Sequence, residues 1–315
     1  MTNRLILDTD GGVDDAQALL LLIANGRTPF AVTTVFGNVD LPTATRNVLA
    51  TLAVAGATAE VHHGAAEPLV QAVIDAKKVH GEDGLGGAEL PDEIADPSGD
   101  DAVGFLVSTF SAAAARGEPI DLLMIGPLTN LALALRRDPA ITKGIGQLTI
   151  MGGTIHGRGN TTPAAEFNVF ADPEAASVVF AAAIDTVVVP WETCVAHAMQ
   201  GVDVDRLYAR VEASRYKAFS EVLVQHARKH FAIREKGDAF RFIDPLAAAM
   251  VVDPAIVTRS LRASVDVALA PGITRGMTVI DPSGRLGTPM VTLIEEVRLD
   301  RLIALYEESV LRKPA

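Results

Sequence analysis

The chain has 315 residues, of which 49% are hydrophobic and 21% charged, so it can bury a large core and is not disordered as a whole. Its 27 basic and 39 acidic residues give a net charge of −12, which disfavours binding to nucleic acid or to an anionic membrane. The single cysteine, Cys194, excludes a disulfide framework; because the start MTNRLILDTD is not a signal peptide and no run of 18 apolar residues occurs, we expect a soluble, cytoplasmic protein.

Short apolar runs alternate with longer amphipathic stretches along most of the chain. The runs predict strands at residues 5–7, 31–36, 121–125, 147–151 and 186–189. The amphipathic stretches predict helices at 14–25, 43–55, 103–116, 130–137, 173–183 and 300–311, and one or two long helices within 202–231. This alternation predicts an α/β fold with an open, mostly parallel sheet flanked by helices.

The organisation indicates one domain over residues 1–315, since no repeat, linker or shift in composition divides the chain. A glycine-rich stretch suggests a mobile loop around 76–90, and a helical segment around 202–236 is expected to border the site. Ligands of open parallel sheets bind beyond the carboxyl ends of the strands, so the site is expected there.

Four carboxylates follow the first predicted strand, at Asp8, Asp10, Asp14 and Asp15. Carboxylates crowded in a buried place repel one another, so some must be protonated or share a cation. Oxygen ligands suit a hard cation such as Ca²⁺ or Mg²⁺. Asp14 and Asp15 alone could instead cap the next helix and complement its dipole.

Two other acidic motifs were considered for this segment. The twelve-residue calcium loop fails, because Val13 stands where that loop needs glycine. Haloacid-dehalogenase-like phosphatases also carry an Asp-x-Asp pair after their first strand, here Asp8 and Asp10. Those enzymes need a hydroxyl residue at a later strand end, and the end Leu123-Met124-Ile125-Gly126 has none. A phosphatase is therefore only a minor alternative.

Five segments resemble motifs of the inosine–uridine-type nucleoside hydrolases. The first is the opening DTDGGVDDAQAL, in which Gly11-Gly12 replaces the more usual Pro-Gly. The others, in chain order, are Val35-Phe36-Gly37-Asn38, Gly126-Pro127-Leu128-Thr129-Asn130, Met151-Gly152-Gly153 with Glu166-Phe167-Asn168, and Asp244-Pro245. Their order and spacing extend the resemblance over most of the chain.

The resemblance implies a Ca²⁺-dependent enzyme that hydrolyses the N-glycosidic bond of ribonucleosides in base salvage, usually as a homodimer or homotetramer. The implied metal ligands are Asp10, Asp15, the backbone carbonyl of Ile125, and Asp244. Asp10 would also take the proton from the attacking water as general base. The implied ribose-binding residues are Asp14, Asn38, Met151, Asn160, Glu166 and Asn168. Such a carboxylate-rich pocket suits the ribosyl cation that develops in glycosidic cleavage.

One position departs from the family pattern. The best-known members carry a histidine directly before the late aspartate and use it to protonate the leaving base, but this chain has Ile243. General-acid help is typically worth about 10²–10⁴ in rate. His80 and His230 are candidates for a replacement acid, each with a purely structural alternative, and a loss of turnover would leave a nucleoside- or ribose-binding protein.

The base pocket is the least constrained part of the site. His80 resembles a family histidine near the base, while Asp40 could contact a base edge or cap the following helix. Trp191 could stack on the base or belong to the core, and Phe231 is a similar aromatic candidate. His226 and His230 share one helix face, a spacing that also fits a solvated surface. The sequence does not indicate which base is preferred.

Overall fold

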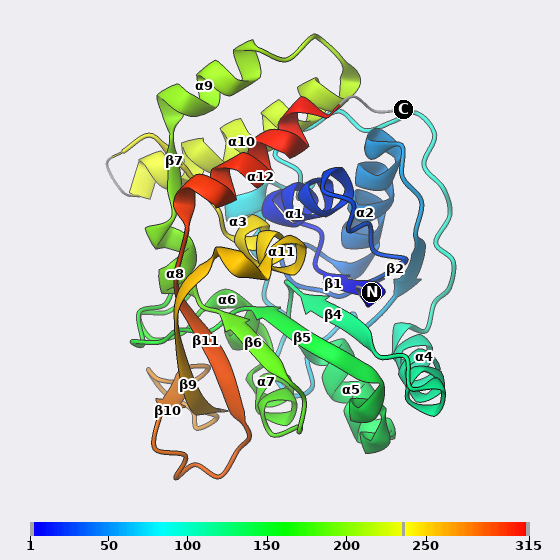
Figure 1. The fold of residues 1–315 in the computed structure, drawn as a ribbon, viewed down its shortest axis with the longest axis vertical. Coiled ribbons are helices and arrows are strands. Elements are labelled where there is room, and N and C mark those ends of the chain that lie inside the picture. Colours follow the sequence, from blue (N-terminus) through cyan, green and yellow to red (C-terminus); the bar gives the residue numbers. More distant parts are fainter. Residues whose placement is uncertain (1–2, 235–236, 313–315) are drawn as a thin grey trace.

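The computed structural model describes residues 3–234 and 237–312, and its centre is a sheet of nine strands in the order β10-β9-β11-β6-β5-β4-β1-β2-β3 (Figure 1). The neighbouring strands β3, β2, β1, β4, β5, β6 and β11, in this order across the sheet, pair in parallel. Strand β9 pairs antiparallel with both β11 and β10. The predicted open, mostly parallel sheet is confirmed.

All five predicted strands are present in the structure, as β1, β2, β4, β5 and β6. The strands of the large sheet are β1 Leu5–Thr9, β2 Ala31–Thr34, β3 Glu60–His63, β4 Ile120–Met124, β5 Ile145–Met151, β6 Thr186–Val189, β9 Val257–Val267, β10 Thr278–Asp281 and β11 Met290–Val297. A separate antiparallel pair joins β7 Ala198–Gln200 to β8 Ala239–Arg241. The sequence prediction missed β3, both short strands of this pair, and the three antiparallel strands β9, β10 and β11.

The helices begin and end close to the predicted bounds where these were given. They are α1 Val13–Ala24, α2 Leu41–Ala55, α3 Lys77–His80, α4 Ala102–Arg116, α5 Thr129–Arg137, α6 Phe167–Ala171, α7 Pro173–Phe180, α8 Trp191–Ala196, α9 Gly201–Ala209, α10 Arg215–Arg234, α11 Asp244–Val252 and α12 Leu299–Leu311, with short 3₁₀ helices at Pro139–Gly144 and Pro254–Ile256. The segment predicted around 202–236 forms two helices, α9 and α10, and its last two residues lie outside the described part of the chain.

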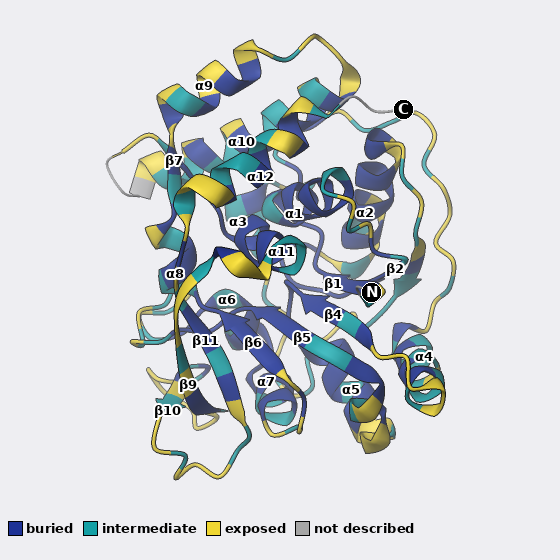
Figure 2. Cartoon of the chain, viewed as in Figure 1, coloured by how far each residue is buried: buried dark blue, intermediate teal, exposed yellow. Residues whose placement is uncertain are grey.

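Helices cover both faces of the sheet. Because successive side chains of a strand point to opposite faces, each strand contributes to two separate cores. Leu5 and Leu7 of β1 belong to a core built with α1, α2, α10, α11 and α12. Ile6, between them, belongs to a second core with α4, α5 and α7. Figure 2 shows the sheet and the inward sides of these helices as buried, with exposed residues at the outer surfaces. A strand buried on both sides therefore reads as the continuous apolar run seen in the sequence.

The strand order places a ligand-binding edge beside β1. From β1 the chain adds β2 and then β3 on one side, and it later adds β4, β5 and β6 on the other. The connections that leave β1 and β4 at their carboxyl ends therefore diverge and leave a crevice between them. Because β1, β2 and β4 run in the same direction, the residues that follow them, 10–12, 37–38 and 125–126, lie at one edge of the sheet. Among the described residues, no helix combines the length and apolar character needed to span a bilayer.

A buried arginine joins the helical segment that borders this edge. Arg228 of α10 has a side chain only 7% exposed. Its Nη1 lies 2.5 Å from Oδ1 of Asp205 on α9, and its Nη2 lies 2.6 Å from Oδ2 of Asp238, just before β8. The guanidinium thus ties together three segments that are separate in sequence.

We expect Arg228→Met to destabilise the protein by about 1–3 kcal/mol, because charge-assisted hydrogen bonds from a buried guanidinium are lost while both aspartates can rehydrate. Urea unfolding measures this change. The matched control is Arg206→Met, which removes an exposed pair with Asp203 and should cost no more than about 1 kcal/mol. Equal midpoints for the two variants would contradict the role given to Arg228.

Candidate active site

The turn after β1 holds its first carboxylate through the neighbouring strand end. Both oxygens of Asp10 accept hydrogen bonds from Asn38, one from the backbone N–H and one from the side-chain amide, each at 2.8 Å. The same amide nitrogen lies 2.9 Å from Oδ2 of Asp15. Gly37 permits this approach, because a Cβ there would lie 2.1 Å from Oδ2 of Asp10. The end of β2 therefore positions two carboxylates at the end of β1.

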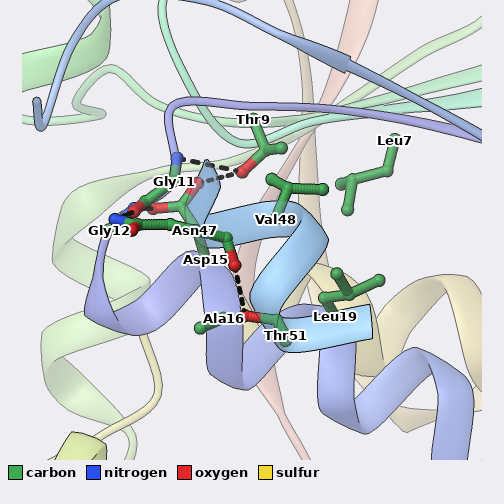
Figure 3. Close-up of a pocket in the computed structure, with 10 residues that line it drawn as sticks. All are labelled: Leu7, Thr9, Gly11, Gly12, Asp15, Ala16, Leu19, Asn47, Val48 and Thr51. Atoms are coloured by element: carbon green, nitrogen blue, oxygen red, sulfur yellow. Dashed lines mark hydrogen bonds between the residues drawn. The ribbon is translucent and has the colours of Figure 1, made fainter. Parts of the chain in front are cut away.

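A network below the turn fixes Asp15 (Figure 3). Its carboxylate accepts from the hydroxyl of Thr9 and from the backbone N–H of Gly12, the latter at 2.8 Å. Asn47 of α2 donates to the carbonyl of Gly11 at 2.9 Å, and Gly11 itself has a φ of +68°, which favours glycine. The small cavity of about 10 Å³ that these residues enclose has room for no more than about one water. Asp15 therefore caps the start of α1 and also belongs to the cluster of carboxylates.

Asp8 belongs to the framework and not to the open site. It is fully buried, and its Oδ2 accepts from the hydroxyl of Thr33 at 2.5 Å and from the amide of Asn130 at 2.8 Å. Asn130 also donates to the carbonyl of Thr34 and accepts from the N–H of Ala65. Burial raises the pKa of Asp8 to about 7. A phosphoryl group has no access to this carboxylate, so the structure does not support the phosphatase alternative.

Three further carboxylates converge at the floor of the crevice. Asp14 and Asp15 from α1 and Asp244 from the start of α11 each offer an oxygen, and these atoms lie within 4.8 Å of one another. Burial and the neighbouring negative charges raise the pKa of Asp244 well above its usual range, and burial raises the pKa of Asp14 to about 6. One oxygen of Asp14 is buried without a hydrogen-bond partner among the described residues. This all-oxygen set fits a hard divalent cation, which would relieve the repulsion.

The three carboxylates that could hold a metal ion overlap with the predicted ligands, which stay a prediction. Asp15 and Asp244 belong to both, but Asp14 stands in the observed group where Asp10 was expected. Asp10 still adjoins the group, since one amide nitrogen of Asn38 bridges Asp10 and Asp15. The carbonyl of Ile125 also reaches this edge.

The loop after β5 contributes a second polar wall. The side chain of Glu166 caps α6, accepting from the backbone N–H groups of Asn168 and Gly153 at 2.9 Å each. Burial raises the pKa of Glu166 to about 7. The amide of Asn168 donates to the carbonyls of Ile125 and Met151 at 3.0 and 3.1 Å. These bonds link the ends of β4 and β5 to one loop and fix the direction of its polar groups.

One cavity of about 390 Å³ opens at this edge and gathers most of the predicted site residues. Those that line it are Asp14, Asn38, His80, Ile125, Met151, Asn160, Glu166, Asn168, Trp191, His230, Phe231, Ile243 and Asp244. Asp10 and Asp15 do not line it and are buried. A volume of this size is typical of a small-molecule site.

Asp40 is absent from the cavity lining, which corrects its suggested place in the base pocket. It caps α2, where its side chain accepts from the backbone N–H of Thr43 at 3.0 Å, and it lies 3.6 Å from the Nζ of Lys77. The side chain is exposed and serves the helix terminus.

His80 lies in the cavity as a neutral ring. Its Nδ1 accepts from the backbone N–H of Val13 at 3.1 Å, so its proton is carried on Nε2. Burial lowers the pKa of His80 to about 4. The segment predicted as a mobile loop is attached here to two helices, through His226 to the carbonyl of Val79 and through Asn47 to the carbonyl of Asp83, both at 2.8 Å. His80 therefore offers a neutral N–H donor to the cavity.

Aromatic side chains form another wall of the cavity. The rings of Trp191 and Phe231 stack with centroids 6.3 Å apart, and His230 meets Phe231 edge to face at 5.9 Å. Ile243 lies between this wall and Asp244, and its carbonyl accepts from the buried thiol of Cys194 at 3.6 Å. The isoleucine side chain offers no proton to a ligand in the cavity.

Several lining residues were not anticipated from the sequence. Phe167 and Phe170 of α6 line the cavity, and so do Ile74 from the segment before α3 and Lys78 of α3. The segment around Ile74 has no periodic pattern, so nothing in the sequence indicated its position. Phe167 stands inside the motif Glu166-Phe167-Asn168, which was the one available signal.

The sequence and the fold were compared with known proteins. Residues 5–304 match the family described as inosine-uridine preferring nucleoside hydrolase. A Leishmania major protein of that name is 34% identical over 89% of this chain and 88% of its own length. Non-specific ribonucleoside hydrolase RihC of Shigella boydii is 37% identical over 90% of each chain. A solved plant nucleoside hydrolase, PpNRh1, superposes with a TM-score of 0.90 at 31% identity, covering 99% of this chain and 100% of its own.

We expect Asn130→Ala to cost about 2–4 kcal/mol of stability, because it leaves Asp8 and the N–H of Ala65 buried with hydrogen bonds lost. Chemical denaturation measures the loss. The matched control is Asn160→Ala in the half-exposed loop after β5, which should change stability by less than about 0.5 kcal/mol. If Asn130→Ala cost less than about 0.5 kcal/mol, like the control, the framework around Asp8 would not need this amide.

Proposed function

The chain belongs to the inosine-uridine preferring nucleoside hydrolase family and is a nucleoside hydrolase, and from that premise we propose that it cleaves ribonucleosides to ribose and free base with the help of Ca²⁺. The observation that carries the proposal is the single cavity, which combines buried carboxylates, a polar wall and an aromatic wall. The charge and the polar groups suit a sugar, while the aromatic rings suit a base.

In this proposal Asp15, Asp244, Asp10 and the carbonyl of Ile125 hold the cation, with Asp14 beside them. The donor set supports it, since it consists of oxygens alone. When bound, the cation supplies positive charge that lowers the pKa of a water and offsets the repulsion between the carboxylates. A carboxyl group whose pKa burial has raised is a strong proton acceptor once it is ionised, and this favours Asp10 as the general base.

We propose that the polar wall binds the sugar. Asp14, Glu166 and the amide oxygens of Asn38 and Asn168 offer acceptors, because the amide N–H groups of those two residues are bonded inside the protein, and Asn160 adds an amide donor, with Met151 in the same lining. The sugar's hydroxyl groups can both donate and accept, so they match this mixed set. The fixed carboxylates then favour the positive charge that develops on the ribose ring as the glycosidic bond breaks.

The base is proposed to lie between His80 and the wall formed by Trp191, His230 and Phe231. Ile243 cannot protonate it, and a neutral His80 acts as a hydrogen-bond donor. Ile243 is also the observation that favours the second candidate, a nucleoside- or ribose-binding protein with little turnover. We further propose cytoplasmic base salvage and a homodimer or homotetramer, which rest on the family resemblance.

Ribose release decides between these candidates. We expect purified protein to release ribose from a panel of purine and pyrimidine nucleosides and from 4-nitrophenyl riboside, whose leaving group needs no acid. Asp10→Ala should lower the rate by at least about 10²–10⁴, because the water loses its proton acceptor. The control, Asp185→Ala, changes an exposed aspartate before β6 and should keep the wild-type rate. Near-wild-type turnover by Asp10→Ala would contradict the role of Asp10, and binding without turnover by the wild type would favour the binding protein.

Removal of the cation is a separate test. We expect exhaustive chelation to abolish ribose release and added Ca²⁺ to restore it, because the carboxylates repel one another without a counter-charge. Elemental analysis should find about one ion per chain, and Asp244→Asn should weaken Ca²⁺ binding in a titration. If elemental analysis finds no bound metal and the protein still releases ribose at the full rate, the proposed dependence on Ca²⁺ is wrong.

A further inference from the structure

An irregular segment, residues 64–76, runs from β3 to α3 and supplies part of the cavity lining. It contains no helix or strand, and its last three residues, 74–76, line the cavity. Ile74 from this segment and Phe167 from α6 both pack against a small buried cluster of Val35, Phe36 and Ala171. The cluster therefore joins this segment to both parts of the proposed sugar wall, since the chain continues from Phe36 to Asn38 and Phe167 stands between Glu166 and Asn168.

The side chain of Gln71 holds the 64–76 segment against α6. Its Nε2 donates to the carbonyls of Phe170 and Ala171, at 2.7 and 3.1 Å. These two residues end α6, where the last carbonyls of a helix have no N–H partner within the helix itself. Phe170 also lines the cavity. The amide of Gln71 therefore joins the segment that carries Ile74 to the helix that carries Phe167 and Phe170.

Arg275, from the connection between β9 and β10, holds Gln71 in turn. Its Nε donates to Oε1 of Gln71 at 3.1 Å, and its Nη2 lies 2.9 Å from each carboxylate oxygen of Glu174 on α7. The side chains of Arg275 and Glu174 are only 18% and 17% exposed. The next residue, Gly276, packs directly on Phe170, because a Cβ there would lie 2.9 Å from Cδ2 of the ring. Gln71 and Arg275 lie outside the cavity lining that the described residues form, so both act through the residues they hold.

We propose that Gln71 and Arg275 are positioning residues, which fix the sugar side of the cavity before the substrate binds. The inference rests on the proposed hydrolase function and adds two residues outside the cavity to it. The connection continues to the carboxylates, because the backbone N–H of Ala76 donates to the carbonyl of Asn38 at 3.1 Å.

The physical reason is the absence of regular structure in the 64–76 segment, which leaves its order to side-chain contacts. Without Gln71 and Arg275 the substrate would have to order this segment as it binds, and that entropy cost weakens binding. A segment that is in place only about one tenth of the time lowers the apparent affinity about tenfold. The carboxylates that serve the bond cleavage are held by other groups, so the effect falls on KM and not on kcat.

The first test removes the amide with Gln71→Met, which keeps the length of the side chain. We expect KM for inosine, uridine and 4-nitrophenyl riboside to rise by the same factor, about 10-fold, with kcat within about twofold of the wild type. The inhibition constant of free ribose should rise in parallel, because these ligands share only the sugar. The matched control is Gln200→Met, the same change at an exposed position of β7, which should leave both constants unaltered.

A double-mutant cycle tests whether the two residues act as one unit. Arg275→Met should raise KM as Gln71→Met does, and the double variant should raise it little further, whereas independent effects would multiply to about 100-fold. The control for the arginine is Arg262→Met, which changes an exposed residue of β9 that bonds the hydroxyl of Thr292. It should leave KM unaltered.

The outcomes separate this inference from the proposed function. If the wild type cleaves ribosides and Gln71→Met has an unchanged KM, the inference is overturned and the hydrolase function stands. A lower kcat with unchanged KM also overturns it, since a smaller folded fraction has that effect, and so do multiplicative effects in the cycle.

If the wild type cleaves no riboside with Ca²⁺ present, the proposed function is wrong and calorimetric titration with ribose tests the inference. Equal affinities of the wild type and Gln71→Met, or no binding by the wild type, then overturn it. Should methionine impair folding, Arg275→Lys gives the same readout, because lysine keeps the charge beside Glu174 but lacks the fork that also reaches Gln71.

Discussion

Five carboxylates lie buried or half-buried around the carboxyl end of β1, and the surrounding structure is arranged to tolerate them. Each buried carboxylate is disfavoured in its charged form, and neighbours of like charge add to the penalty. Neutral groups donate hydrogen bonds to these carboxylates: Asn38 donates to Asp10, and Thr9 and the N–H of Gly12 donate to Asp15. These donors reduce the repulsion without cancelling the negative charge, which leaves the site ready for a cation and for a positively charged sugar.

The carboxylates divide into framework and chemistry by what lies around them. Asp8 faces β2 and Asn130 inside the molecule, so it links strands and has no route to a ligand. Asp14 and Asp244 line the cavity, with Asp15 below them. Only Thr9 separates Asp8 from Asp10, so both side chains leave the extended chain on the same side. Asn130 of α5 donates to Asp8, and Asp8 is fully buried.

The sequence allowed the parallel part of the fold and the carboxylate cluster to be predicted, because both are recorded in local patterns. Strands buried on two faces appear as apolar runs, and Asp10, Asp14 and Asp15 stand together in the chain. The strands β9, β10 and β11 escaped because they pair antiparallel and carry charged residues along exposed stretches. Phe170 and Gln17 were not predicted, because a local pattern does not show whether an aromatic side chain in a short helix faces a cavity, or whether the amide of a glutamine inside a helix lacks a partner.

The base side of the cavity suggests how this chain departs from the family pattern without losing its chemistry. A histidine before Asp244 would act by giving a proton, and the apolar Ile243 removes that means. In dry surroundings a neutral donor is worth more than in water, since no solvent competes for the developing charge. Gln17, whose amide has no hydrogen-bond partner among the described residues, and His80, kept neutral by burial, both line a small recess beside the cavity. Leaving-group help at this site is therefore expected to come from hydrogen bonds that strengthen with charge instead of from a transferred proton, which makes the rate depend on the shape and polarity of the base.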